Sequence, residues 1–96
     1  MELRDIQSFV LLARSHSILE TAQELQLTPG AVHKHLKTLE TELGVRLYEK
    51  RGGALRLTAA GEAALPYFQE VLDCRDAIVR VISDWKQDTT GTLRIG

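Results

Sequence analysis

The sequence predicts a mainly α-helical fold with three short helices, a two-stranded hairpin and one long helix. The helices are indicated by apolar residues at helical spacing over residues 2–14, 18–25 and 29–43. A hairpin is indicated by Gly52-Gly53, which separates two short runs in which apolar and polar residues alternate. Beyond Thr58 the apolar residues take heptad spacing to about residue 87, which favours a single long helix.

Composition restricts the class of protein. The 96 residues are 44% hydrophobic and 26% charged, which favours one small folded domain with an extension over a disordered chain. No apolar run approaches the ~20 residues of a membrane span, and the acidic N-terminus does not resemble a signal peptide. Cys74 is the single cysteine and cannot form a disulfide within the chain, which fits a cytoplasmic location.

The second helix has a clear start signal. Ser17 is a good N-cap, and Glu20 three residues later completes a capping-box pattern. The helix is expected over residues 18–25, followed by a tight turn at Gln26 and Leu27. The helix before it, residues 2–14, is interpreted as scaffold.

The third helix combines a buried stripe with a basic face. Thr28 is the expected N-cap, and Pro29 occupies the first position, where its missing N–H costs nothing. Gly44 is the expected stop. An apolar stripe runs along one side of this helix, through Val32, Leu36, Leu39 and Leu43. The opposite side presents Gly30, Lys34 and Lys37, with His33 at its edge.

Two helices joined by a tight turn, followed by a hairpin, make a winged helix-turn-helix, whose second helix lies in the DNA major groove. The net charge of −1 argues weakly against nucleic acid, but its distribution reverses that argument. Residues 34–56 carry six basic side chains against three acidic ones. Lys50 and Arg51 lie near the wing tip and are expected to contact the DNA backbone or the minor groove.

The long helix is expected to pair with a second copy of the chain. One helix of this length cannot bury its apolar side against a small winged domain. The predicted dimer interface consists of apolar residues at heptad spacing, namely Leu65, Phe68, Leu72, Val79 and Ile82. The expected domain boundaries are therefore 1–58 for the winged domain and 59–90 for a linker/dimerisation helix, with 91–96 as the start of an absent effector domain. Residues 92–96 are expected to begin a strand of that domain.

The whole pattern resembles the N-terminal DNA-binding domain and linker helix of the LysR-type transcriptional regulators. The strongest matching run is Leu39-Glu40 with Glu42 to Glu49, followed by Arg56-Leu57-Thr58 and Ala60-Gly61-Glu62. Further matches are Met1 to Arg4 with Phe9 and Val10, Ser17 and Ala22, and Leu93 to Gly96.

The resemblance implies a sequence-specific DNA-binding transcriptional regulator that dimerises through antiparallel linker helices. Full-length members usually form tetramers, and a small-molecule effector binds a C-terminal domain that is absent here. No cofactor is therefore expected in this chain. Departures fall on the recognition helix, where the family commonly has Gln at the position of Pro29, Pro or Ser at Gly30, Ser at His33 and Arg at Lys34.

The predicted DNA-binding residues lie at two helix starts, along the recognition helix (about residues 29–40) and at the wing tip. They are Ser17, Thr28, Pro29, Gly30, His33, Lys34, Lys37, Lys50 and Arg51. The expected partners are double-stranded DNA and a second copy of the chain, with no membrane.

The main alternative is a helical dimerisation or protein-interaction module in which the lysine face is incidental. An enzyme is disfavoured, because the sequence has no glycine-rich phosphate loop, no Cys-x-x-Cys pair and no His-Glu-x-x-His motif. A metal site is also disfavoured, because His33 and His35 point to opposite sides of a helix.

Overall fold

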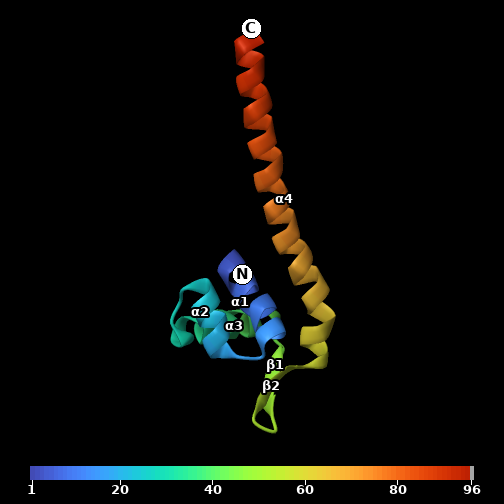
Figure 1. Ribbon diagram of the computed structural model, residues 1–96. Coiled ribbons are helices and arrows are strands. Elements are labelled where there is room, and N and C mark those ends of the chain that lie inside the picture. Colours follow the sequence, from blue (N-terminus) through green and yellow to red (C-terminus); the bar gives the residue numbers. More distant parts are fainter. Residues whose placement is uncertain (96) are drawn as a thin grey trace.

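A computed structural model describes the backbone of residues 1–95 and the side chains of residues 1–88. The described chain is mainly helical, with a two-stranded wing and one long helix (Figure 1). The elements are α1 (Leu3–Ser15), α2 (Ile18–Leu25), α3 (Pro29–Leu43), β1 (Tyr48–Arg51), β2 (Ala54–Leu57) and α4 (Ala59–Ile95). The predicted fold class is confirmed.

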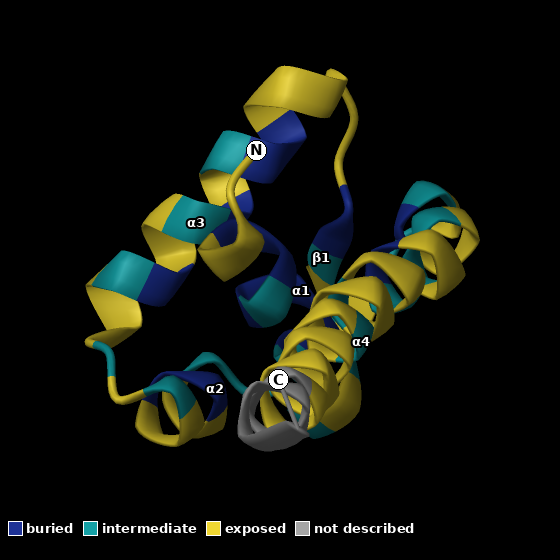
Figure 2. Ribbon diagram, turned by 90° about the horizontal axis from the view of Figure 1, so that it is seen from above, coloured by how far each residue is buried: buried dark blue, intermediate teal, exposed yellow. Residues whose placement is uncertain are grey.

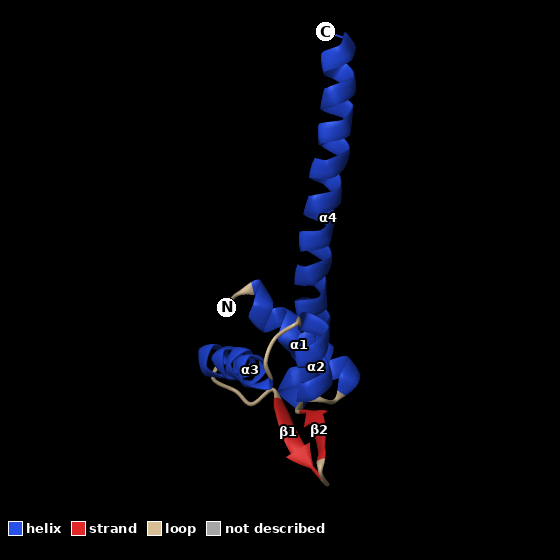
Figure 3. Ribbon diagram, turned by 60° about the vertical axis from the view of Figure 1, so that its left-hand side comes forward, coloured by secondary structure: helices blue, strands red, loops and turns tan. Residues whose placement is uncertain are grey.

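Helix α1 is the centre of the arrangement. It contacts α2, α3 and α4, and Figure 2 shows α3 and α4 on opposite sides of it. The wing projects at one end of the molecule, and the C-terminal part of α4 extends from the other end (Figure 3). The exposed side of α3 is therefore free of the long helix.

The expected N-caps are present, with one correction. The hydroxyls of Ser17 and Thr28 accept hydrogen bonds at 3.1 Å from the backbone N–H groups of Glu20 and Ala31. The capping box predicted for Ser17 and Glu20 is absent, because the Ser17 N–H donates to the Ser15 hydroxyl at 3.1 Å. The side chain of Glu20 therefore has no role in this cap.

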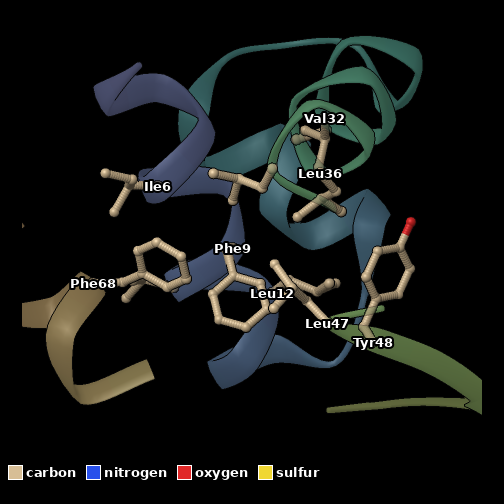
Figure 4. Close-up of a cluster of buried hydrophobic side chains, with 11 residues drawn as sticks. Ile6, Phe9, Leu12, Val32, Leu36, Leu47, Tyr48 and Phe68 are labelled. Atoms are coloured by element: carbon tan, nitrogen blue, oxygen red, sulfur yellow. The ribbon is translucent and has the colours of Figure 1, made fainter. Parts of the chain in front are cut away.

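The core lies between α1, α3 and the start of the wing, and it also takes in one residue of α4 (Figure 4). Phe68 is only 6% exposed, and its ring meets that of Phe9 edge to face with 5.3 Å between centroids. Phe68 was predicted to lie in a dimer interface, and its packing against its own core leaves little of its surface for another chain. Leu65 and Leu72 are partly buried and also pack against this core.

The wing turns at Gly52 and Gly53, which have φ angles of 56° and 83°. Two successive residues with positive φ form the hairpin turn that suits the twist of paired strands, and glycine adopts it without strain. Strand β1 begins at Tyr48, later than the expected alternation from Val45, which is 44% exposed.

Helix α4 continues through Ile95, so the strand expected to begin at residue 92 is wrong for residues 92–95. Residue 96 lies outside the described part of the chain. A strand needs a neighbouring strand to satisfy its backbone groups, whereas a helix satisfies them internally. Pro66 lies within the helix, where it removes one internal hydrogen bond. None of the described helices is apolar enough over a sufficient length to cross a bilayer.

A buried carboxylate joins α3 to the wing. Glu40 is 8% exposed, and its Oε2 accepts a hydrogen bond of 2.8 Å from the backbone N–H of Leu47. The Arg46 Nε lies 3.9 Å from the same oxygen. The carboxylate therefore provides the acceptor that the Leu47 N–H would otherwise lack in the core.

Thr58 continues this link into α4. Its N–H donates to the Leu47 carbonyl at 3.0 Å, and its hydroxyl donates to the Arg46 carbonyl at 2.6 Å and accepts from the Gly61 N–H at 3.1 Å. Gly61 lies so close that an added Cβ would overlap the Leu47 carbonyl oxygen. The start of α4 can approach β1 in this way only because residue 61 has no side chain.

Substitution of Gly61 should destabilise the fold strongly. We expect Gly61→Ala to lower the free energy of unfolding by at least ~2 kcal/mol, because backbone atoms must move to admit the methyl group. Gly30→Ala is the matched control, since its Cβ would meet nothing nearer than the Thr28 hydroxyl at 4.0 Å. It should be neutral or stabilising in urea unfolding, because alanine favours a helix. Equal stability of the two variants would contradict the close approach.

Removal of the buried carboxylate should also destabilise the fold. We expect Glu40→Ala to lower the free energy of unfolding by ~1–3 kcal/mol, because the Leu47 N–H loses its acceptor. Glu40→Gln keeps an oxygen acceptor and should lose less. Glu42 is an exposed carboxylate on the same helix, so Glu42→Ala is the control and should cost the least in the same measurement. A Glu40→Ala variant as stable as the Glu42→Ala control would refute the proposed role of the hydrogen bond.

Candidate nucleic-acid interface

The exposed side of α3 brings together most of the residues predicted for its surface. Val32 and Leu39 are fully buried against the core, which fixes the rotation of the helix. His33 and Lys34 are consequently exposed, as are Pro29 and Gly30 at the helix start. Figure 2 shows this exposed side on the flank away from α4. The Lys34 ammonium and the His33 imidazole are thus both accessible on the same face of α3.

The N-terminus of α3 is also accessible. Thr28 is exposed and caps the helix, and Pro29 follows at the first helical position. A helix start carries partial positive charge, and its free N–H groups can bind an anion such as a phosphate. The N-terminal half of α3 therefore offers backbone and side-chain donors on one surface.

Lys37 differs from Lys34 in its surroundings. Its Nζ lies 3.3 Å from Glu40 Oε1 and 5.7 Å from the centroid of the Tyr48 ring. These contacts direct the ammonium toward the root of the wing, although the side chain remains 48% exposed. The pKa of Tyr48 is raised mainly by burial, while the charge of Lys37 acts in the opposite direction.

The wing tip presents further cations. Lys50 and Arg51 are exposed at the end of β1. The Arg51 Nε lies 3.8 Å from Glu49 Oε2, but the Arg51 side chain is 76% exposed, so this ion pair is weak. Arg56, which is not among the predicted DNA-binding residues, is exposed on β2 opposite Glu49.

Ser17 has a largely structural environment. It is half-buried, and its carbonyl accepts hydrogen bonds from the hydroxyls of Ser15 and Thr21 at 3.0 and 2.9 Å. Thr21 is 1% exposed and was missed as a core residue. The burial of Thr21 could have been inferred from its position beside Ala22 on the inward side of α2.

The two histidines of α3 have separate environments. His35 is half-buried, and its Nδ1 lies 3.0 Å from the hydroxyl of Ser8, a fully buried residue of α1. His35 therefore packs against α1, whereas His33 is exposed. Over the described residues, no group of three or more His, Cys, Asp or Glu side chains could hold a metal ion.

The sequence is similar to those of bacterial regulators. It is 37% identical over 95 residues to the uncharacterized HTH-type transcriptional regulator YxjO of Bacillus subtilis (strain 168), covering 99% of this chain and 33% of that protein. It is 38% identical over 94 residues to the HTH-type transcriptional regulator CbbR of Xanthobacter flavus, covering 98% of this chain and 28% of that protein. The chain thus spans about a third of the length of these relatives.

The fold is similar to those of solved structures. A full-length OxyR C199D from Pseudomonas aeruginosa matches with a TM-score of 0.83 and 28% identity, covering 88% of this chain and 28% of that one. A complex of the BenM DNA-binding domain with benA site 1 DNA matches with a TM-score of 0.81 and 26% identity, covering 88% of this chain and 98% of that one.

A family model described as "Bacterial regulatory helix-turn-helix protein, lysR family" matches residues 3–62, more than half of the chain. The predicted family is confirmed, and with it the assignment to transcriptional regulators and not to enzymes. The chain belongs to the lysR family of bacterial regulatory helix-turn-helix proteins.

Proposed function

We propose that this domain binds promoter DNA as a homodimer, with α3 in the major groove and the wing against the flanking backbone or minor groove. The observation that carries the proposal is the accessible N-terminal half of α3, where Lys34 and His33 are exposed on a side that no other described element covers. The DNA complex of the similar BenM domain supports it.

The residues of α3 are proposed to make different kinds of contact with DNA. Pro29, Gly30, His33 and Lys34 enter the groove, and the helix start at Thr28 faces a phosphate. Lys34 supplies the main cation of this face. Lys37 contributes less, because it is already paired with Glu40. Ser17 acts through the start of α2, where it orders the backbone near a second phosphate.

The wing is proposed to add contacts that carry little sequence information. Lys50 and Arg51 are exposed cations at the tip, suited to phosphates or to the negative potential of a narrow minor groove. The exposed ion pair of Arg51 with Glu49 can exchange for a phosphate at little cost.

The homodimer is proposed to form through the far part of α4. Val79 and Ile82 are 59% and 47% exposed there. Ile78 and Trp85, which are 63% and 61% exposed, extend the same side of the helix. Leu65 and Leu72 lie at its edge, because they also pack on their own domain. Burial of these side chains against a second α4 would remove a large apolar surface from water.

The remaining proposals concern a longer protein. The matched relatives are about three times the length of this chain, which leaves room for a further domain. We place small-molecule sensing and tetramer formation in such a domain, and none of the described residues is assigned to a cofactor. We also propose a cytoplasmic location, because the DNA of bacteria lies there and the family is bacterial.

The DNA-binding proposal predicts a salt-dependent interaction. Affinity for a labelled random duplex, measured by fluorescence anisotropy, should fall steeply with salt, because phosphate contacts release counterions. Lys34→Ala should weaken binding more than Arg4→Ala, a control on the exposed start of α1, and should reduce the salt slope by about 1. Equal effects of the two variants would count against the assigned face, and no binding by folded protein at low salt would refute the proposal.

The dimer proposal predicts a position-dependent effect along α4. Ile82→Asp should shift sedimentation equilibrium toward the monomer, because a carboxylate would be buried in an apolar interface. Gln87→Asp adds the same charge roughly opposite Ile82 on the helix and should leave the dimer intact. Dissociation of both variants, or of neither, would contradict the assigned side.

A further inference from the structure

His16 ends α1 in a backbone conformation that favours glycine. Its φ and ψ angles are 57° and 22°, in the left-handed region. Glycine is the usual residue at such a helix end, because a Cβ is strained there. Gln26 ends α2 with the same φ of 57°, so the chain offers an internal comparison. The helix end alone therefore does not explain why residue 16 is a histidine.

The ring of His16 reaches the wing. Its Nδ1 lies 3.3 Å from the carbonyl oxygen of Leu55 on β2. Arg51 and Ala54 flank the two-residue turn, which places the next pair, Lys50 and Leu55, outside the hydrogen-bonded positions of the ladder. The Leu55 carbonyl consequently points away from β1 and is free to accept a hydrogen bond. Because a carbonyl only accepts, Nδ1 must carry the proton.

The contact is made where the wing leaves the body of the domain. Leu55 is half-buried and packs against the core, whereas residues 50–54 are exposed. A two-stranded hairpin is marginally stable alone, so its direction depends on contacts at this point. His16 supplies one from α1, the helix that also packs against α3.

We propose that His16 is a positioning residue that holds the wing at a fixed angle to α3, so that Lys50 and Arg51 reach DNA while α3 is in the groove. The effect on DNA binding rests on the proposed function above. The effect on the wing itself does not, and the two are measured separately.

The first measurement uses the free 96-residue protein. In His16→Gly, the ¹⁵N heteronuclear NOE of Gly52 and Gly53 should fall, because the wing becomes more mobile on the ps–ns timescale. The melting temperature should not fall, because glycine relieves the left-handed backbone. Gln26→Gly is the matched control, which should relieve the same strain and leave the NOE of the wing unchanged. His16→Asn tolerates the left-handed region, and its Nδ2–H lies one bond beyond Cγ, as the histidine Nδ1–H does. It can therefore still donate to the Leu55 carbonyl and should preserve the NOE of the wing.

The second measurement is a double-mutant cycle with a labelled random-sequence duplex. His16→Gly should weaken binding by about 3- to 10-fold, the range for losing one neutral hydrogen bond. In a Lys50→Ala/Arg51→Ala background the same change should have almost no effect, because the mobile tip no longer carries the cations.

The outcomes separate the two proposals. A rigid wing in His16→Gly would overturn the positioning role, as would an equal loss of affinity in the two backgrounds of the cycle. A lowered melting temperature with loosening throughout α1 would assign His16 to the helix end and would also overturn it. If the unaltered protein does not bind the duplex, the DNA-binding proposal fails, while the NOE comparison still tests the contact with the wing.

Discussion

The hydrogen bond from the Leu47 N–H to the buried carboxylate of Glu40 is the constraint on which the rest of the structure depends. It fixes the chain as it leaves α3 and sets the direction of β1. The Leu47 carbonyl then accepts from the Thr58 N–H, at the close approach that only Gly61 permits. Helix α3, the wing and α4 are thus joined at one backbone residue, and a shift of any one must move the other two.

The long helix divides into two parts with different environments. Its first part belongs to the domain, because Phe68 packs on Phe9 and Leu65 and Leu72 lie against the core. Beyond these residues the apolar side chains from Ile78 to Trp85 are exposed. The attachment of the first part fixes the direction of the second. A partner bound there would be held at a defined angle to α3, so pairing of two helices would set the spacing between two recognition helices.

Local chemistry made the helix boundaries predictable, whereas partners distant in sequence were not. Ser17, Thr28 and Gly44 act within one helical turn, so their roles can be inferred from neighbouring residues. Periodicity identified the apolar side of α4, but it does not say whether a position such as Phe68 meets its own core or another chain. The burial of Glu40 was not predicted, because its role as acceptor for the Leu47 N–H depends on a contact that only the fold shows. The exposed face of α3 was predictable because the spacing of apolar residues within one helix determines it. The pairing of Lys37 with Glu40 and Tyr48 was not, because it depends on how α3 packs against the wing.

The arrangement also explains how a chain with a net charge of −1 can offer a surface to DNA. The basic excess of residues 34–56 lies on α3 and the wing, while six of the acidic residues lie on α4, at Glu62, Glu70, Asp73, Asp76, Asp84 and Asp88. The molecule is 64 Å long, and α4 extends away from the wing (Figure 1). Charges are screened over about 8 Å at physiological salt, so the far carboxylates have little effect on a phosphate at α3. The length of α4 therefore keeps most of these carboxylates away from the basic excess that we propose meets DNA.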